Sequence, residues 1–123
     1  MLNVSQAIWN EISSTIYVEK KSIEKLKKLF KHYNLNDYIY IGVIKRAISV
    51  DAKTALSILN TLREHGFVEM NYGYYCFDCE RTCSTIYETY GRLPLRVYCD
   101  YCERELTFTN NSILLYKVIK TNE

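Results

Sequence analysis

The spacing of apolar residues predicts that the chain begins with helices. Residues 4–12 repeat apolar side chains at helical intervals, and residues 14–18 then predict a short extended stretch. Ser22 is the predicted N-cap of the next helix. One face of that helix is apolar, formed by Ile23, Leu26, Leu29, Phe30 and Tyr33, and the other is basic, formed by Lys25, Lys27, Lys28 and Lys31. An amphipathic helix of this kind buries one face, while its lysines form a solvated surface or contact phosphates.

Two further helical patterns follow with almost no residues between them. The first contains Ile41, Ile44, Ala47 and Ile48 and extends to about Ser49. The second is expected from about Ala52 to His65, with Asp51 as its N-cap and Gly66 ending it in the left-handed conformation. Helices joined this tightly cross at a steep angle, so the outer face of the second is presented to solvent, as in a helix-turn-helix.

The remaining chain has the alternation and turn residues of β-structure. Residues 67–70 and 74–77 predict a hairpin around Asn71-Tyr72-Gly73, and residues 85–90 and 95–98 predict another around a turn at 91–94. A third hairpin is expected from residues 105–109 and 112–119. Residues 113–119 also fit a helix, but their length favours a strand.

Composition is that of a folded globular protein and indicates a basic first half. Nearly half of the 123 residues are apolar, Gly and Pro are scarce, and no long apolar run or export signal is visible. We therefore expect a cytoplasmic protein that does not contact a membrane. Residues 1–70 contain ten Lys/Arg and seven Asp/Glu, whereas residues 71–123 contain six and seven. Contact with a polyanion is accordingly expected from the first half.

Four cysteines are arranged as two Cys-x-x-Cys pairs, Cys76 with Cys79 and Cys99 with Cys102. Two such pairs are the usual ligand set of a tetrahedral thiolate site, with one structural Zn²⁺ held at roughly 2.3 Å from each sulfur. Four protein ligands leave no open coordination position, so the metal is expected to stabilise the fold. A thiolate-bound iron centre uses similar spacing and is the alternative metal.

Two details of the cysteine region depart from a simple ribbon. The fifth thiol, Cys83, is expected to be a bystander, although its position lets it compete as a ligand. Zinc knuckles usually have Gly after the second Cys, and here Glu80 and Glu103 stand at those positions. Because a non-Gly residue with positive φ is uncommon, the local turn is open to a different geometry.

The order of these patterns resembles a winged helix-turn-helix domain over about residues 22–77. The resemblance rests on the capped third helix and its passage into a hairpin, read as Leu62-Arg63-Glu64-His65-Gly66-Phe67-Val68-Glu69. A winged helix followed by a four-cysteine ribbon is similar in arrangement to the alpha subunit of archaeal and eukaryotic transcription initiation factor E. We therefore expect an α+β protein with a winged helix-turn-helix domain and N-terminal extension in residues 1–75 and a β-rich zinc ribbon in residues 76–123.

The resemblance implies a DNA-binding transcriptional regulator or accessory factor. Residues on the outer face of the third helix are then expected in the major groove, and cations at the end of the preceding helix against the backbone. The candidate DNA-binding residues are Lys45, Arg46, Lys53, Thr54, Ser57, Asn60 and Thr61.

A noncatalytic adaptor that bridges proteins in a larger assembly is the second hypothesis. The candidate DNA face has few cations, and the tyrosine-rich second half suits a protein interface. No catalytic triad, phosphate-binding loop or paired acidic motif is present, and we expect neither an enzyme nor a small-molecule substrate.

Overall fold

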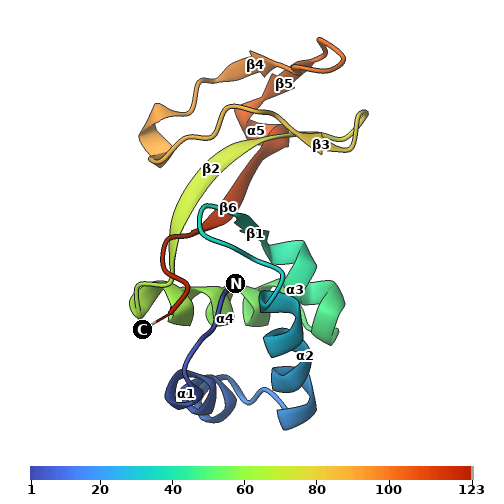
Figure 1. The fold of residues 1–123 in the computed structure, drawn as a ribbon. Coiled ribbons are helices and arrows are strands. Elements are labelled where there is room, and N and C mark those ends of the chain that lie inside the picture. Colours follow the sequence, from blue (N-terminus) through green and yellow to red (C-terminus); the bar gives the residue numbers. More distant parts are fainter. Residues whose placement is uncertain (123) are drawn as a thin grey trace. The chain divides into compact units, whose positions relative to one another are not determined.

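The first helices of the chain form because their apolar residues repeat with helical period and their ends are fixed by backbone geometry. A computed structural model describes residues 1–122, and its elements are drawn in Figure 1. They are α1 (Gln6–Ile16), α2 (Lys20–Phe30), β1 (Tyr38–Tyr40), α3 (Ile41–Ile48), α4 (Ala52–Glu64), β2 (Val68–Cys76), β3 (Arg81–Thr82), η1 (Tyr90–Arg92), β4 (Arg96–Tyr98), β5 (Glu105–Thr107), α5 (Phe108–Asn111) and β6 (Ser112–Val118).

The mixed α and β composition is confirmed, and the chain divides into two compact units. We call residues 1–69 together with residues from 116 onward the helical unit, and residues 70–115 the cysteine unit. The expected boundary between residues 75 and 76 differs from this division in two ways. The division falls earlier, inside β2, and the end of the chain returns to the helical unit because the last residues of β6 pair there.

The observed bounds of helices α3 and α4 agree closely with those predicted from the sequence. The Asp51 carboxylate accepts a hydrogen bond of 2.8 Å from the backbone N–H of Thr54, as expected of an N-cap. Gly66 has a φ of 80° just after the helix, which is the left-handed conformation that glycine adopts without strain. Ser49 ends α3 with a φ of 53°, and the chain thus turns within three residues into α4.

The first two helices differ from the prediction at their ends. Helix α1 continues through Ile16, where an extended stretch was expected, and ends at Tyr17 with a φ of 60°. Helix α1 buries Ile8, Trp9 and Ile12 on one side. Helix α2 begins at Lys20 with Glu19 as N-cap, so the assignment of Ser22 as the cap is wrong.

The core of the helical unit collects the apolar faces of its helices. Trp9 of α1 stacks on Phe30 of α2 with ring centroids 5.7 Å apart. Aromatic pairs in this geometry add to the stability that burial provides. The fully enclosed residues of this core include Ile12, Leu26, Ile39, Ile44, Ile58, Leu59, Leu62 and Phe67.

The predicted hairpin at residues 67–77 is absent. Residues 68–76 form one uninterrupted strand, β2, and the turn expected at Asn71-Tyr72-Gly73 does not exist (Figure 1). The backbone of Gly73 does not adopt a positive φ. A Cβ at this position would lie 3.3 Å from Ile86 and 3.6 Å from Leu115, so the glycine serves close packing.

The strands pair over long distances in sequence. The larger sheet has the order β1-β6-β2-β3, and β4 and β5 form a separate antiparallel pair with Val97 opposite Leu106. Strand β6 over residues 112–118 is confirmed, but it pairs with β1 and β2, and not with residues 105–109 as expected. The hairpin expected from residues 85–90 and 95–98 is also wrong, because β4 pairs with β5 and Tyr87 forms only an isolated bridge with Tyr72.

Removing a buried side chain from α4 tests this description of the helical core. We expect Leu62→Ala to lower the free energy of unfolding by about 2–5 kcal/mol, because Leu62 is fully buried and a cavity would remain. Leu35→Ala is the matched control, since Leu35 is largely exposed, and its effect is expected to stay within about 0.5 kcal/mol. Urea unfolding followed by circular dichroism measures both, and equal effects would contradict the assigned core.

Candidate metal centre and helix groove

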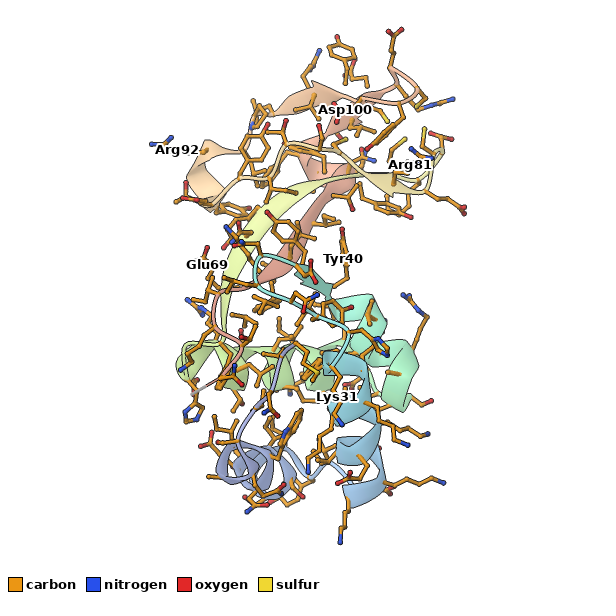
Figure 2. All side chains as sticks on the ribbon, viewed as in Figure 1. Lys31, Tyr40, Glu69, Arg81, Arg92 and Asp100 are labelled. Atoms are coloured by element: carbon orange, nitrogen blue, oxygen red, sulfur yellow. The ribbon has the colours of Figure 1, made fainter. Side chains whose placement is uncertain are left out.

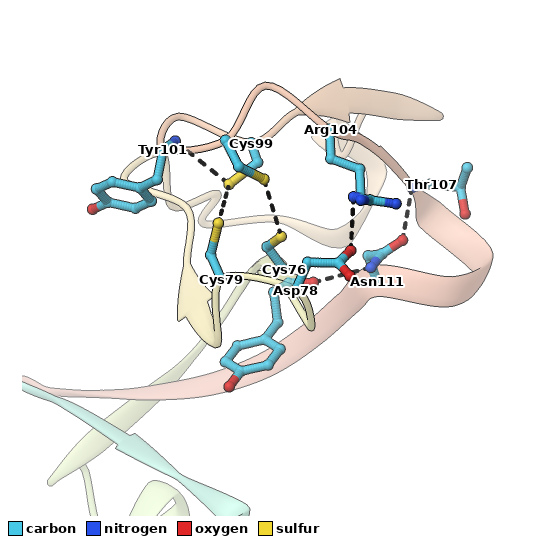
Figure 3. A network of polar contacts seen from close by, with 10 residues as sticks. Cys76, Asp78, Cys79, Cys99, Tyr101, Arg104, Thr107 and Asn111 are labelled. Atoms are coloured by element: carbon cyan, nitrogen blue, oxygen red, sulfur yellow. Dashed lines mark hydrogen bonds and ion pairs between the residues drawn. The ribbon is translucent and has the colours of Figure 1, made fainter.

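The four paired cysteines come together at one point of the cysteine unit. Their sulfur atoms all lie within 4.8 Å of one another, and this cluster is the group in the described residues that could hold a metal ion. Cys76 Sγ is 3.7 Å from Cys102 Sγ, and Cys79 Sγ is 3.9 Å from Cys99 Sγ (Figure 3). A tetrahedron with metal–sulfur bonds of about 2.3 Å has sulfur–sulfur edges of about 3.8 Å. The four thiols therefore have the spacing of a tetrahedral thiolate site.

Each cysteine pair is held in the same kind of turn. Cys76 ends β2 and the turn leads to β3, while Cys99 follows β4 and its turn leads towards β5. Glu80 and Glu103, the residues after the second cysteine of each pair, have φ values of 55° and 61°. Both glutamates thus adopt the left-handed conformation in which zinc knuckles usually have glycine. The usual geometry of the knuckle turn is therefore present although the residue is not glycine.

Backbone amides already favour a charged sulfur at Cys99. The N–H of Tyr101 points at Cys99 Sγ over an N···S distance of 3.5 Å. Hydrogen bonds from this amide and from that of Cys102 lower the pKa of the Cys99 thiol to about 7. The neighbouring thiols act in the opposite direction at Cys79, where contact with Cys102 first and burial next raise the pKa to about 12. Four thiolates so close together repel one another, and a bound cation would remove that repulsion.

Polar contacts outside the cysteines join the two turns to their surroundings. Asp100, inside the second pair, accepts hydrogen bonds from the backbone N–H and the hydroxyl of Ser84, which lower the pKa of its carboxyl group. Asp78, inside the first pair, forms an ion pair with Arg104 at 2.8 Å (Figure 3). The Asp78–Arg104 pair is exposed and contributes little to stability by itself. These contacts could not be predicted from the sequence, because a single Asp within a Cys-x-x-Cys turn does not indicate which distant residue it contacts.

The fifth thiol lies apart from the cluster. Cys83 is buried in the small apolar core of the cysteine unit, close to Tyr74 and Leu106, and does not belong to the group of four. Burial is the main cause that raises the pKa of its thiol. Its backbone N–H donates to the carbonyl of Tyr74, which fixes it beside β2. The structure thus places Cys83 in the apolar core of the cysteine unit and outside the group of four thiols.

The candidate DNA-binding residues of α4 line a groove in the helical unit. This groove has a volume of about 690 Å³ and lies between α1 and α4. It brings together Lys53, Thr54, Ser57, Asn60 and Thr61, with Glu11, Thr15 and Tyr17 from α1 on the other side. Lys45 and Arg46 are exposed on α3 and are not among the residues of this groove. The sequence analysis did not foresee α1 here, because the pattern of residues 4–18 shows its period but not its packing partner.

Several polar side chains of the groove already have partners. Asn60 Oδ1 accepts a hydrogen bond of 2.8 Å from the hydroxyl of Tyr116 in β6, and Asn60 therefore helps to fix α4 against the sheet. The hydroxyls of Ser57 and Thr61 donate to carbonyls one turn earlier in the helix. Their oxygens keep free lone pairs, so the face acts mainly as an acceptor surface, with Lys53 as its cation.

Glu11 and His65 form a contact beside the groove between α1 and α4. His65 Nε2 is 3.2 Å from Glu11 Oε1, which connects α1 to the end of α4. His65 also forms the C-cap of α4, at the position where the helix is expected to end. The contact lies at the surface, so its contribution to stability is small.

Replacing one clustered cysteine tests the proposed ligand set. We expect the reduced protein to contain about one metal ion per chain and Cys99→Ser to lose most of it, because three thiolates bind a soft divalent ion far more weakly than four. Cys83→Ser is the matched control and is expected to keep the metal. Elemental analysis by mass spectrometry gives the stoichiometry, and equal loss in both variants would show that the ligand assignment is wrong.

The described helices are all too short or too polar to cross a lipid bilayer. Comparison with protein-family models, with curated proteins and with solved structures gave no match to this chain.

Proposed function

We propose that this protein is a zinc-stabilised winged-helix protein that binds double-stranded DNA and acts as a transcriptional regulator or accessory factor. The observation that supports this proposal best is the strand order β1-β6-β2, taken with the chain order α2, β1, α3, α4. In a winged helix, a short strand before the helix-turn-helix pairs with the last strand. That last strand pairs in turn with the strand that follows the recognition helix. The pairing of β1 with β6 and of β6 with β2 follows the same order and so supports the proposal.

On this proposal the wing is the cysteine unit. A simple winged helix joins its last two strands by a short loop, which the sequence analysis placed within residues 67–77. Here β2 and β6 are joined by residues that form a compact unit of their own. The metal-binding residues would thus be inserted between the last two strands of the winged helix, instead of following its last strand. We propose that the likeness to the alpha subunit of transcription initiation factor E concerns the presence of these two modules, since their order along the chain differs.

Zinc is the ion that we assign to the four thiols. Four cysteine ligands in a tetrahedron are typical of structural Zn²⁺, and they leave no position for a substrate or a reactive water. When bound, the ion would supply charge compensation and cross-link the two turns, with no part in a reaction. Metal binding of this kind is coupled to folding, since the unfolded chain does not hold the four sulfurs together.

The DNA contact is assigned to the exposed cations and hydroxyls of α3 and α4. Lys53 is exposed near the N-terminus of α4, where Thr54 and Ser57 share its groove. Lys45 and Arg46 are exposed in the last turn of α3 and would meet the phosphate backbone. The helical unit contains twelve Lys/Arg and eight Asp/Glu, and the cysteine unit contains four and six. This distribution favours the helical unit as the side that approaches a polyanion.

A noncatalytic adaptor is the second candidate function, and the surface of the cysteine unit favours it. Large apolar or aromatic side chains are exposed there, with Leu95 exposed to 80% and Tyr98 to 63%. Phe77, Tyr90 and Tyr101 are exposed as well. Aromatic side chains of this kind often anchor protein interfaces. A role in a multi-subunit assembly would use this surface, and the DNA-binding face of α4 would then have no function.

Absorption spectroscopy tests the metal. We expect the purified protein to be colourless in visible light and to contain zinc, because Zn²⁺ has a filled d shell. Iron in the same site would absorb visible light strongly. A coloured protein with stoichiometric iron would overturn the assignment of zinc and favour an electron carrier.

Titration of the protein with duplex DNA at several salt concentrations tests the function. We expect the binding constant to fall steeply with salt, and Lys53→Ala to weaken binding and reduce the slope of log K against log salt by about one. Arg92→Ala, which removes an exposed cation from the cysteine unit, is the control and is expected to leave the slope unchanged. No binding, or binding that does not depend on salt, would favour the adaptor.

A further inference from the structure

The structure points to a second phosphate-binding surface, on α2, outside the residues assigned to DNA above. We propose that a lysine face formed by Lys21, Lys25, Lys28 and Lys31 contacts the phosphate backbone of the nucleic acid. This inference rests on the proposed function, because it assumes the same class of partner. It adds a contact surface that is separate from α3 and α4.

The four lysines lie on one side of the helix because of their spacing. They follow one another at intervals of four, three and three residues, and side chains at these intervals are neighbours on an α-helix. With a rise of 1.5 Å per residue, Lys21 and Lys28 are about 10 Å apart along the axis. The labelled Lys31 in Figure 2 marks the end of this face, just after the last residue of α2. Several charges in a row match the repeated charges of a phosphate backbone.

Glu24 is the one carboxylate of α2 close to the lysine face, since it lies four residues before Lys28. Residues 19–31 contain six lysines and two glutamates, so this segment has a net positive charge. Lys27, outside the lysine face, contacts Glu24 at 3.3 Å and Gln6 at 2.8 Å through its Nζ. The lysine face itself forms no ion pair within residues 1–122. Like charges at these spacings repel each other, and binding a polyanion would relieve that repulsion.

A shallow cavity lies beside α2, next to the lysine face. The cavity has a volume of about 320 Å³ and lies between residues 2–9 and α2. Lys27, Lys28 and Lys31 line it, and Glu24 is the acidic residue among its lining. Three lysines and one glutamate give the lining a net positive charge, which raises the local concentration of anions. A phosphate group would meet two members of the lysine face there.

The packing of α2 favours a nucleic acid over a lipid surface. A helix that binds a membrane inserts apolar side chains between the lipids while its lysines meet the headgroups. The apolar side chains of α2 are already used, because Ile23, Leu26 and Phe30 are buried in the helical unit. Phe30 also stacks on Trp9. The lysine face therefore offers charge without an apolar surface to insert, which suits a hydrated phosphate backbone.

Neutralising three of the lysines tests the inference. The variant K21Q/K25Q/K28Q leaves Lys31 in place, because a cation near the end of a helix stabilises it. Binding to duplex DNA is measured by fluorescence anisotropy at several salt concentrations. We expect the slope of log K against log salt to fall by about 2.7, in line with three lost phosphate contacts. The control K21R/K25R/K28R keeps the charges and is expected to keep the slope.

Each outcome of this experiment supports or overturns the inference. If the unchanged protein binds DNA and the glutamine variant has the same slope, the lysine face is not a contact surface while the proposed function stands. If the unchanged protein does not bind DNA, the proposed function and this inference are both wrong. Vesicles of phosphatidylserine are the second probe. Binding to vesicles that exceeds binding to DNA and disappears in the glutamine variant would assign the face to membranes and overturn the inference.

Discussion

The gathering of four sulfur atoms within 4.8 Å of one another is the constraint on which the cysteine unit depends. A unit of this size has little apolar core, and its central residues are Tyr74, Leu106 and three cysteines. Small domains commonly need a metal or a disulfide to compensate for such a core. The ion that we assign there would form four bonds to these sulfurs, and the turns that end at Glu80 and Glu103 already place the ligands at the required spacing.

Features that depend on neighbouring residues could be predicted from the sequence. Helix α4 was predicted well because Asp51 and Gly66 fix its ends by local hydrogen bonding and backbone conformation. The cluster of four cysteines could be predicted equally well, since each Cys-x-x-Cys turn places two thiols within four residues. The left-handed φ of Glu80 and Glu103 was not predictable, because the geometry of the cluster and not the residue type imposes it.

Features that depend on distant residues were missed. Asn71-Tyr72-Gly73 has the composition of a turn, yet Gly73 lies in a strand because Ile86 and Leu115 leave no room for a side chain. The position of α1 beside α4 also could not be predicted from the sequence. The same holds for the hydrogen bond from Tyr116 to Asn60. Tyr116 and Asn60 are 56 positions apart, and no local periodicity encodes contacts between residues so distant in sequence.

The return of β6 to the helical unit has a consequence for how the chain folds. Val118 exchanges backbone hydrogen bonds of 2.8 Å with residues 36 and 37, so the sheet of the helical unit cannot close until the chain through residue 118 is present. Closing so long a loop carries an entropic cost that slows folding. A cross-link between residues 76–79 and 99–102 would shorten the effective loop and guide the last strand to its place. The ion would then speed the closing of this sheet as well as stabilise the folded protein.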